Sequence, residues 1–410
     1  MTPLPTEDNI RSILGLQGLA VTRVRKEGDQ GWLVEAELPA KASCPRCHEE
    51  SSSVHDVRDK PSRLEWVLLG SWKVWVVLKR RRLRCFTCHK PFTQIVPGLG
   101  PRQRMSIQAQ ASLIAQLAEE SFAAIKRSLG ISYGRVRRCL ERLPLPWVDW
   151  KVLVGEEGMI SLGIDEHSFR GKDLVITVTC LSRHRVLAVL PNDRQKTLRA
   201  FLMELSARVA DRVVGVCIDL KEGFRKVVEE VFPQALVVAD HFHVIQDANR
   251  RVDETRRLEQ ELNKKAIARW PLLKGEERLT PKQAQRLAEL RQEYPSLGEA
   301  HWLKEELRAL YGCEDYESAQ EHFSRLLINA EEADDLELGR WAGTLRRWRK
   351  EILNYFKLPI TNAYTEGVHT KMKLIKRTSY GLRNIEIYRR KMMLGFLPRT
   401  LQALTPHLLT

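Results

Sequence analysis

The sequence predicts a multidomain α+β protein. Its 410 residues are enough for two to four packed units. Short strand-like segments fill the N-terminal quarter, strands and helices alternate in the middle, and a long stretch with helical periodicity alone follows. With 43% hydrophobic and 29% charged residues, the composition excludes a small peptide, a coiled coil and a disordered tail.

Charge and cysteine usage narrow the class of protein. Lys and Arg number 67 against 52 Asp and Glu, a formal net charge of +15, which favours a polyanionic partner and above all nucleic acid. The eight Cys include two CxxC pairs, a usage typical of a reducing cytosol rather than of a secreted disulfide framework. The polar start and the lack of any apolar run of about 18 to 20 residues predict neither a signal peptide nor a membrane anchor.

Residues 1–97 are predicted to form a zinc-binding domain. Strand patterns occupy 32–37 and 64–83, the second broken near Gly70 and Ser71. Each CxxC pair places two thiolates on one tight turn, and two pairs complete the tetrahedral sulfur site that Zn²⁺ prefers. Because four ligands leave no open position, we expect one structural Zn²⁺, and buried or redox-active thiols are the alternative. The predicted ligands are Cys44, Cys47, Cys85 and Cys88.

A helix-turn-helix is predicted within residues 104–145. Between Ser121 and Leu143, Gly130 supplies a turn and Ser132 can cap a second helix. A plain helical hairpin with a solvated basic face is the alternative. The side chains expected to meet DNA are Lys126, Arg135, Arg137 and Arg138.

The next part of the chain alternates strands and helices and is predicted to form an α/β sheet. Strands are expected at 159–165, 173–181, 184–190, 213–219 and 235–240, with helices at 195–210 and 221–231. Three strands followed by helix, strand, helix and strand give a sheet with an antiparallel start and a parallel end, which is the order of a ribonuclease H-like fold. We expect the first part of a core at 152–246 and an all-α insertion at 247–360. The second part of the core and the C-terminal helices are expected at 361–410.

Carboxylates end two of these strands. Asp165 follows the first and Asp219 the fourth, and in this fold the two strands are neighbours, so their carboxylates converge on one edge of the sheet. Glu366 opens a helix after the insertion and supplies a third. Such oxygen ligands hold Mg²⁺, for which Mn²⁺ could substitute, and two ions can activate a nucleophile and stabilise a leaving oxygen in phosphoryl transfer. Asp240 and His243, three residues apart, are expected to support the site or to contact DNA.

A basic segment from Lys371 to Lys391 is the second candidate DNA contact. It contains eight Lys and Arg and one acid, with Tyr380 and Tyr388 interleaved, and such side chains suit contacts to a nucleic-acid backbone and to bases. A solvated basic face is the alternative. The predicted contact residues are Lys371, Lys373, Lys376, Arg377, Tyr380 and Arg383.

Over nearly the whole chain, these motifs resemble one family: the bacterial insertion-sequence transposases of the ISL3 type, within the DDE class. The resemblance rests on CPRC and CFTC, on GIDEH, on IDLKEGFRKVVEEVFPQALVVADHFHVI and on TNAYTEGVHTKMKLIKRTSYGLRN. It implies metal-dependent cleavage of double-stranded DNA at terminal inverted repeats and transfer of the cut strands to target DNA. It also implies a homodimer or higher oligomer on DNA, in the cytoplasm and associated with the nucleoid.

Carried over residue by residue, the resemblance makes Asp165, Asp219 and Glu366 the catalytic metal ligands. It matches Asp240 and His243 to the family's Cys-or-Asp, x, x, His motif. Two other functions stay open. One is a DNA-binding regulator whose catalytic domain is a relic, and the other is a structure-specific nuclease or Holliday-junction resolvase of the same fold.

Overall fold

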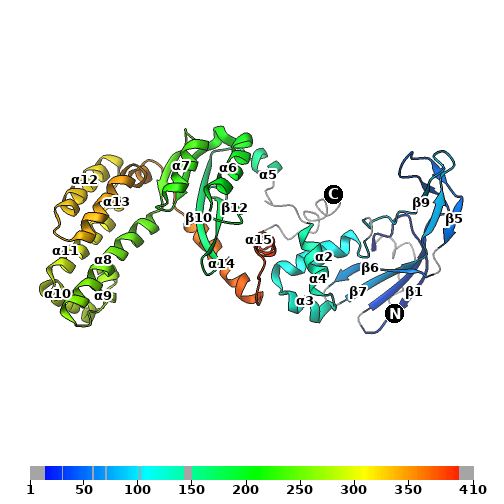
Figure 1. Cartoon of the computed structure of the whole chain (residues 1–410), viewed down its shortest axis with the longest axis horizontal. Coiled ribbons are helices and arrows are strands. Elements are labelled where there is room, and N and C mark those ends of the chain that lie inside the picture. Colours follow the sequence, from blue (N-terminus) through cyan, green and yellow to red (C-terminus); the bar gives the residue numbers. More distant parts are fainter. Residues whose placement is uncertain are drawn as a thin grey trace, which may run out of the picture. The chain divides into compact units, whose positions relative to one another are not determined.

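The chain divides into two compact units. This computed structural model describes residues 14–29, 31–57, 60–69, 72–100, 103–142 and 150–396. Unit 1 comprises Met1–Leu145 with Met372–Thr410, and unit 2 comprises Pro146–Lys371 (Figure 1). The predicted strand break at Gly70 and Ser71, the predicted boundary at residue 145 and the end of the predicted C-terminal helix lie outside the described residues.

Unit 1 contains a four-stranded sheet of order β1-β2-β7-β6, in which β2 and β7 run parallel and the outer pairs antiparallel. Its core includes Val34, Leu64 and Val76, and the buried Trp66, whose indole N–H donates to the carbonyl of Leu14 at 2.8 Å. The strands are β1 (Ala20–Lys26), β2 (Gly31–Glu37), β6 (Ser62–Leu69) and β7 (Trp72–Leu78).

Two smaller sheets of unit 1 carry the CxxC pairs. One is a two-stranded sheet of β3 and β4. The other is a three-stranded sheet of order β5-β8-β9. The first CxxC lies in the turn from β3 to β4 and the second in the turn from β8 to β9, so the pattern at 64–83 splits between two sheets after β7. The strands are β3 (Ala42–Ser43), β4 (Glu50–Ser51), β5 (Val54–Val57), β8 (Arg81–Arg84) and β9 (Pro91–Thr93).

The helices of unit 1 are α2 (Ile107–Glu119), α3 (Phe122–Leu129), α4 (Tyr133–Glu141) and α15 (Ile385–Leu394). Gly130, at φ 61°, ends α3 in the left-handed conformation that glycine adopts without strain. Residues 361–410 are predicted to hold the second part of the core and the C-terminal helices, and α15, one of those helices, packs against α2 and α4. The fully buried Lys391 fixes it there by donating to the carbonyls of Leu117 and Glu120 at the end of α2.

Unit 2 contains a five-stranded sheet of order β12-β11-β10-β13-β14. The strand β10 pairs antiparallel with β11 and parallel with β13, which matches the predicted antiparallel start and parallel end. The strands are β10 (Ile160–Arg170), β11 (Asp173–Cys180), β12 (Arg185–Val189), β13 (Val213–Ile218) and β14 (Leu236–Ala239), and the helices between them are α6 (Gln195–Val209) and α7 (Glu222–Val231).

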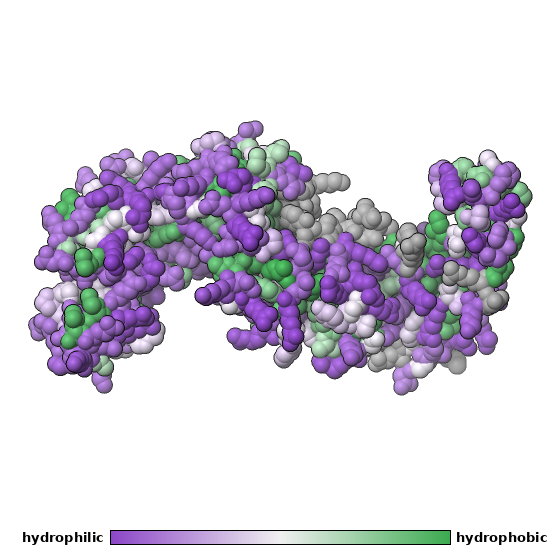
Figure 2. All heavy atoms as spheres, viewed as in Figure 1, coloured by the Kyte–Doolittle hydropathy of each residue, from purple (hydrophilic) through white to green (hydrophobic). Residues whose placement is uncertain are grey.

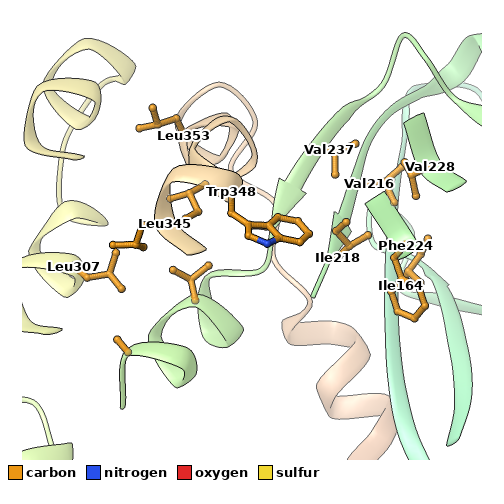
Figure 3. Packing of buried hydrophobic residues seen from close by; sticks show 14 of the residues in the cluster. Ile164, Val216, Ile218, Phe224, Val228, Val237, Leu307, Leu345, Trp348 and Leu353 are labelled. Atoms are coloured by element: carbon orange, nitrogen blue, oxygen red, sulfur yellow. The ribbon is translucent and has the colours of Figure 1, made fainter. Parts of the chain in front are cut away.

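The two faces of this sheet differ in chemistry. Ile164 and its register partner Ile218 belong to an apolar cluster that includes Phe224 of α7, as Figure 3 shows. On the opposite face, Gly163 leaves room for the start of the helix α14 (Ala363–Thr378), since a Cβ there would come 2.5 Å from Asn362 Oδ1. The buried side chains on this second face are polar. They are Ser161, Asp165, His167, Thr177, Thr179, Asn362, Thr365 and His369.

Between β14 and α14 the described chain is helical. The same apolar cluster continues from the sheet into these helices, and in Figure 3 Trp348 lies between Leu345 on the helical side and Ile218 and Val237 on the sheet side. The α-helices are α8 (His241–Asn263), α9 (Trp270–Leu273), α10 (Pro281–Glu293), α11 (Pro295–Leu310), α12 (Tyr316–Glu332) and α13 (Leu336–Leu353). The predicted all-helical segment therefore packs into one core with the sheet.

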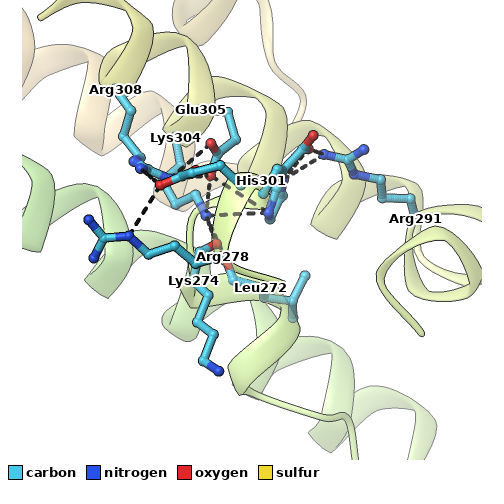
Figure 4. Close-up of polar contacts among 10 residues, drawn as sticks. Leu272, Lys274, Arg278, Arg291, His301, Lys304, Glu305 and Arg308 are labelled. Carbon is cyan, nitrogen blue, oxygen red and sulfur yellow. Dashed lines mark hydrogen bonds and ion pairs between the residues drawn. The ribbon is translucent and has the colours of Figure 1, made fainter. Parts of the chain in front are cut away.

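A buried polar cluster holds α11 against the segment after α9 (Figure 4). Lys304 is fully buried and donates to the carbonyls of Leu272 and Lys274 at 2.9 and 3.0 Å. Burial and the neighbouring charge of Lys304 lower the pKa of His301 to about 3, so this imidazole stays neutral. The hydrogen bonds of Lys304 to two backbone carbonyls join α11 to α9 and to the residue after it.

Figure 2 shows one face of the molecule coloured by hydropathy. On the face that Figure 2 shows, hydrophilic atoms predominate and hydrophobic atoms gather in small patches over both the sheets and the helices. None of the described helices is both long and apolar enough to cross a lipid bilayer.

Candidate active site

Asp165 and Asp219 lie at the same level on adjacent strands. The prediction that the first strand ends at Asp165 is wrong, because β10 continues to Arg170 and pairs Asp165 with Thr177 of β11, whereas Asp219 directly follows β13. The register pairs Ile164 with Ile218, so the two aspartates follow side by side as predicted. Asp165 is 4% exposed, and the side chain of Asp219 is 15% exposed. Potential ligand atoms of the two carboxyl groups lie within 4.8 Å of each other.

His243 joins Asp219 to Asp240. Its Nδ1 lies 3.0 Å from Asp219 Oδ1 and 2.9 Å from Asp240 Oδ2. The hydrogen bond goes to Asp240, which leaves the buried Oδ1 of Asp219 without a hydrogen-bond partner. Because α8 begins at His241, the three-residue spacing brings His243 back over Asp240.

Asp240 is more deeply buried than Asp219. It is 1% exposed. Its Oδ1 accepts from the backbone N–H of Asn362 at 2.9 Å and from the thiol of Cys217 at 3.7 Å. With His243 on the other oxygen, both oxygens of Asp240 are already engaged by the protein.

Glu366 enters the site from the first turn of α14. The beginning of this helix is tied to β10, because Asn362 Nδ2 donates to the carbonyl of Ile164 at 3.2 Å. The buried Oε1 of Glu366 has no hydrogen-bond partner. Potential metal-ligand atoms of Asp240, His243 and Glu366 lie within 4.8 Å of one another, as do those of Asp165, Asp219 and His243. Glu366 thus lies in the second of two groups that share His243.

Asp165 is held by a series of buried polar contacts that runs through His369 and Thr177 to His167. His369, one turn after Glu366 on α14, places Nδ1 3.2 Å from Asp165 Oδ2. Its Nε2 lies 2.9 Å from Thr177 Oγ1, which is 3.3 Å from Nδ1 of His167. All of these side chains are buried, so the chain of contacts fixes the orientation of the Asp165 carboxylate.

The acids perturb one another's pKa values. Burial and the charge of Asp165 raise the pKa of Asp219 to about 10. Burial likewise raises the pKa of Glu366, with a further contribution from Asp240. Burial opposes ionisation of Asp165, but the hydrogen bond and the charge of His369 outweigh it and lower the pKa of that carboxyl.

These residues fit a divalent cation. A metal ion beside Asp165 and Asp219 would reverse the electrostatic balance that keeps Asp219 protonated, because it favours ionised ligands. Asp219 and Glu366 each have a buried oxygen that accepts no hydrogen bond and can serve as a ligand, and the Asp219 oxygen also lies 3.0 Å from His243 Nδ1. Carboxylate oxygens are the donors that Mg²⁺ and Mn²⁺ prefer.

The four predicted zinc ligands converge in unit 1. Their sulfur atoms lie within 4.8 Å of one another, with Cys44 and Cys88 3.7 Å apart and Cys47 and Cys85 3.4 Å apart. Zn–S bonds of about 2.3 Å in a tetrahedron require sulfur atoms roughly 3.8 Å apart. The group can therefore hold Zn²⁺. The two pairs lie in the turns of two separate hairpins, β3–β4 and β8–β9.

The two histidines next to these cysteines are not among the four ligand positions. His48 and His89 each follow the second Cys of a pair, and both have positive φ, 61° and 56°. They close the two turns with the same backbone geometry. The equivalence of the two turns supports a single sulfur site built from two similar halves.

The predicted DNA-contacting residues of α3 and α4 have different surroundings. Lys126 is exposed near the end of α3. Arg137 pairs with Glu141 at 2.7 Å on the exposed side of α4. Arg135 instead forms a two-pronged ion pair with Glu65 of β6. Arg138 is exposed.

The basic C-terminal segment is exposed only in part. Tyr380 is 85% exposed, whereas Tyr388 is 1% exposed and belongs to the packing of α15. The expectation that Tyr388 stacks on bases is therefore wrong, because α15 buries this face against α2 and α4. The exposed predicted contact residues are Lys371, Lys373, Arg377, Tyr380 and Arg383, and Lys376 is half-buried.

Known proteins resemble this chain over most of its length. A family model described as a transposase, of the DDE class and ISL3 type, matches residues 162–392. The chain belongs to this family. It is 27% identical to the transposase for insertion sequence element IS1001 of Bordetella parapertussis, over 94% of this chain and 97% of that protein. It is 24% identical to the transposase for insertion sequence element IS1557 of Mycobacterium tuberculosis, over 78% of each.

The part that matches the ISL3-type transposase family contains every acid of the site. It runs from β10 to α15 and includes the helical segment between β14 and α14. The cysteine group and the helices α2 to α4 precede it. The resemblance to the IS1001 transposase nevertheless extends over nearly the whole chain.

Sequence reasoning missed the residues that orient the acids of this transposase. His369, Thr177, His167 and Asn362 contact Asp165, Asp240 or one another. Two signals could have revealed them. Polar residues alternate along β10 and β11, a period of two that marks a polar buried face. His369 follows Glu366 by three residues, on the same side of one helix.

Proposed function

We propose that this transposase binds the terminal inverted repeats of an insertion sequence and cleaves and joins DNA strands by a DDE mechanism. The observation that supports the proposal is that Asp165 and Asp219, from paired strands, form a potential ligand group with His243, and that His243 also belongs to a second group with Asp240 and Glu366 of α14. We assign Asp165, Asp219 and Glu366 as ligands of two Mg²⁺ ions, in a ribonuclease H-like core interrupted by the helices α8 to α13.

The choice of Asp219 over Asp240 as a ligand follows from their surroundings. Asp219 borders β10 and keeps a buried oxygen without a hydrogen-bond partner. Asp240 already accepts from Asn362, His243 and Cys217. We therefore assign Asp240 and His243 a supporting role, in which they hold the start of α14 and the carboxylate of Asp219 in place.

The reaction consists of two in-line displacements at phosphorus. Bound divalent ions would lower the pKa of the attacking hydroxyl and neutralise charge on the leaving oxygen. In the first displacement water attacks a phosphodiester, and the bond to the 3′ oxygen breaks to leave a 3′-hydroxyl. In the second, this hydroxyl attacks a target phosphodiester and releases a new 3′-hydroxyl. The protein orients both attacking groups through the rigid placement of Asp165, Asp219 and Glu366.

The cysteine group, the helices α3 and α4, and the basic segment after Lys371 are assigned functions from the chemistry of their side chains. We assign the group of four cysteines a structural Zn²⁺, the helices α3 and α4 a helix-turn-helix role in DNA binding, and the exposed basic residues after Lys371 contacts with the DNA backbone. Two element ends must be brought together for joining, so we expect a homodimer or larger assembly on DNA.

A cleavage assay tests the proposal. The substrate is a labelled duplex that carries the inverted repeat found beside the gene, with Mg²⁺ or Mn²⁺ and a supercoiled target plasmid. We expect nicking at the repeat end and joined products, both lost on Asp165→Asn. Binding of the repeat without any cleavage would indicate a regulator, and cutting of branched DNA without joining would indicate a resolvase.

A further inference from the structure

Unit 1 contains a cavity of about 600 Å³ between the edge of its main sheet and α4. Five arginines line this cavity, but only one acid does. The sheet and the segment before α2 supply Arg63, Glu65 and Arg104, and α4 with its C-terminal cap supplies Arg135, Arg138 and Arg142. The excess of positive charge on a concave surface attracts anions strongly.

Most of these arginines already have partners. Arg135 takes up both carboxylate oxygens of Glu65. Arg63 pairs with Glu27 at 2.9 and 3.0 Å and lies 4.2 Å above the ring of Trp75. Arg142 donates to Gln110 Oε1 at 2.9 Å. These contacts hold the walls of the cavity in place.

Two guanidinium groups are left over. Those of Arg104 and Arg138 make no hydrogen bond or ion pair with any residue that the structure describes, and both side chains are exposed. A guanidinium group offers a planar fork of donors that matches two oxygens of a phosphate. The cavity therefore has fixed walls and two donors available for an anion.

The cavity is lined by one face of α4. Arg135, Arg138 and Arg142 follow the helical spacing of three and four residues and so share one face, and this face meets the sheet. Arg137 lies off this face, paired with Glu141. A DNA strand that reached Arg138 would therefore contact the sheet edge at the same time.

We propose that this arginine cavity binds backbone phosphates of a DNA strand, clamping the strand between the sheet edge and α4. The proposal rests on the proposed function only in taking DNA as the ligand. It adds a second wall, with Arg104, to an interface that the sequence places on the helices alone. Backbone contacts of this kind fix position and add affinity without reading sequence.

The test compares binding of a fluorescent duplex of scrambled sequence by full-length variants over a range of salt concentrations. Arg104→Ala with Arg138→Ala removes the two available donors. We expect the slope of log affinity against log salt to fall by about 0.9 for each phosphate that is no longer neutralised, or about 1.8 for the pair. The matched control, Arg23→Ala with Arg25→Ala, removes the same charge from the exposed β1 edge of the same sheet and should keep the wild-type slope.

Additional variants keep the result interpretable. Zinc content and thermal unfolding of each variant report whether unit 1 is intact. Arg104→Lys with Arg138→Lys preserves the charge, and we expect it to restore most of the slope. An unchanged slope for the alanine pair, or an equal decrease in the β1 pair, would overturn the proposal.

The ligand could instead be a free phosphate. Calorimetry with inorganic phosphate at constant ionic strength addresses this, because binding that the alanine pair abolishes while duplex affinity stays at the wild-type value would reject a DNA clamp. Cleavage is scored separately on Asp165→Asn, which should bind the scrambled duplex normally. Failure of the catalytic proposal and failure of the clamp therefore give different results.

Discussion

His369 Nδ1 lies 3.2 Å from Asp165 Oδ2, and both side chains are almost completely buried. The contact joins α14 to β10 across an insertion of more than one hundred residues. It holds the Asp165 carboxylate ionised and fixes its orientation, so His369 is a positioning residue for the proposed metal site.

Replacing His369 should weaken catalysis through Asp165. Removing a residue that orients a metal ligand typically costs about 10- to 100-fold, and we expect His369→Ala to lose that much cleavage. His369→Asn can still donate to Asp165 and should restore part of it.

The pH dependence of metal binding by His369→Ala distinguishes a loss of Asp165 positioning from a general loss of folding. Because His369 lowers the pKa of Asp165, the pH at which metal affinity is half-maximal should move upward in His369→Ala. The same interaction stabilises the fold above the unfolded pKa of Asp165 and is lost as pH falls through the folded value. Metal titrations that show no such shift would argue against this role.

Asp219→Asn should stabilise the metal-free protein while abolishing cleavage. The pKa of Asp219 rises from 3.8 to about 10, so the folded state binds its proton more tightly than the unfolded state. The resulting stability is complete below the unfolded value and is lost as pH rises toward 10.

At pH 8, therefore, the wild-type protein carries an electrostatic penalty that the amide removes. We expect a rise in Tm of a few degrees, since about 1 kcal/mol corresponds to about 2–4 °C in a unit of this size. Thermal unfolding with EDTA at pH 5 and pH 8 measures it, and the gain should be larger at pH 8. A gain independent of pH would point to a cause other than the carboxylate pair.

Substitution of the four acids should distinguish the three proposed metal ligands from Asp240. Asp165→Asn, Asp219→Asn and Glu366→Gln should each abolish cleavage and strand transfer while retaining binding to the inverted repeat. Asp240→Asn should be impaired but should still respond to Mg²⁺ and Mn²⁺. Calorimetry with both metals and cleavage assays on the four variants provide the measurement, and an active Asp219→Asn beside a metal-free Asp240→Asn would exchange their roles.

Zinc should be bound at about one ion per chain. Cys85→Ser with Cys88→Ser removes half of the sulfur group, and we expect release of the metal and unfolding of the N-terminal part of unit 1. Elemental analysis together with circular dichroism checks this. Unchanged zinc content in the double variant would show that these thiols are not the ligands.

Gly163→Ala tests the docking of α14. A Cβ at this position would lie 2.5 to 2.7 Å from side-chain oxygens of Asn362, Thr365 and Thr179, so the start of α14 must shift. We expect a decrease of about 1–3 kcal/mol in stability and a loss of cleavage, because Glu366 moves with the helix. Gly171→Ala, in a turn where a Cβ meets no neighbour but φ is positive, is the comparison, and it should retain cleavage.

Features that depend on local spacing could be predicted from the sequence. Apolar stretches predicted the five strands and their order along the chain. The order of a ribonuclease H-like fold, with acids expected at two strand ends, predicted that Asp165 and Asp219 would meet. The CxxC spacing predicted a sulfur group, and the family motifs predicted a transposase. Each of these signals lies within a short stretch of chain or in the order of neighbouring elements.

Which distant polar groups meet depends instead on the packing of the whole chain. The contact of His369 with Asp165 and that of Asn362 with Asp240 depend on how α14 docks across β10, which no local pattern encodes. The same holds for Glu65, which engages Arg135, and for Lys391, which buries α15 in unit 1. These contacts form between segments far apart in sequence, because each buried polar group must find a partner once the apolar cores have brought the elements together.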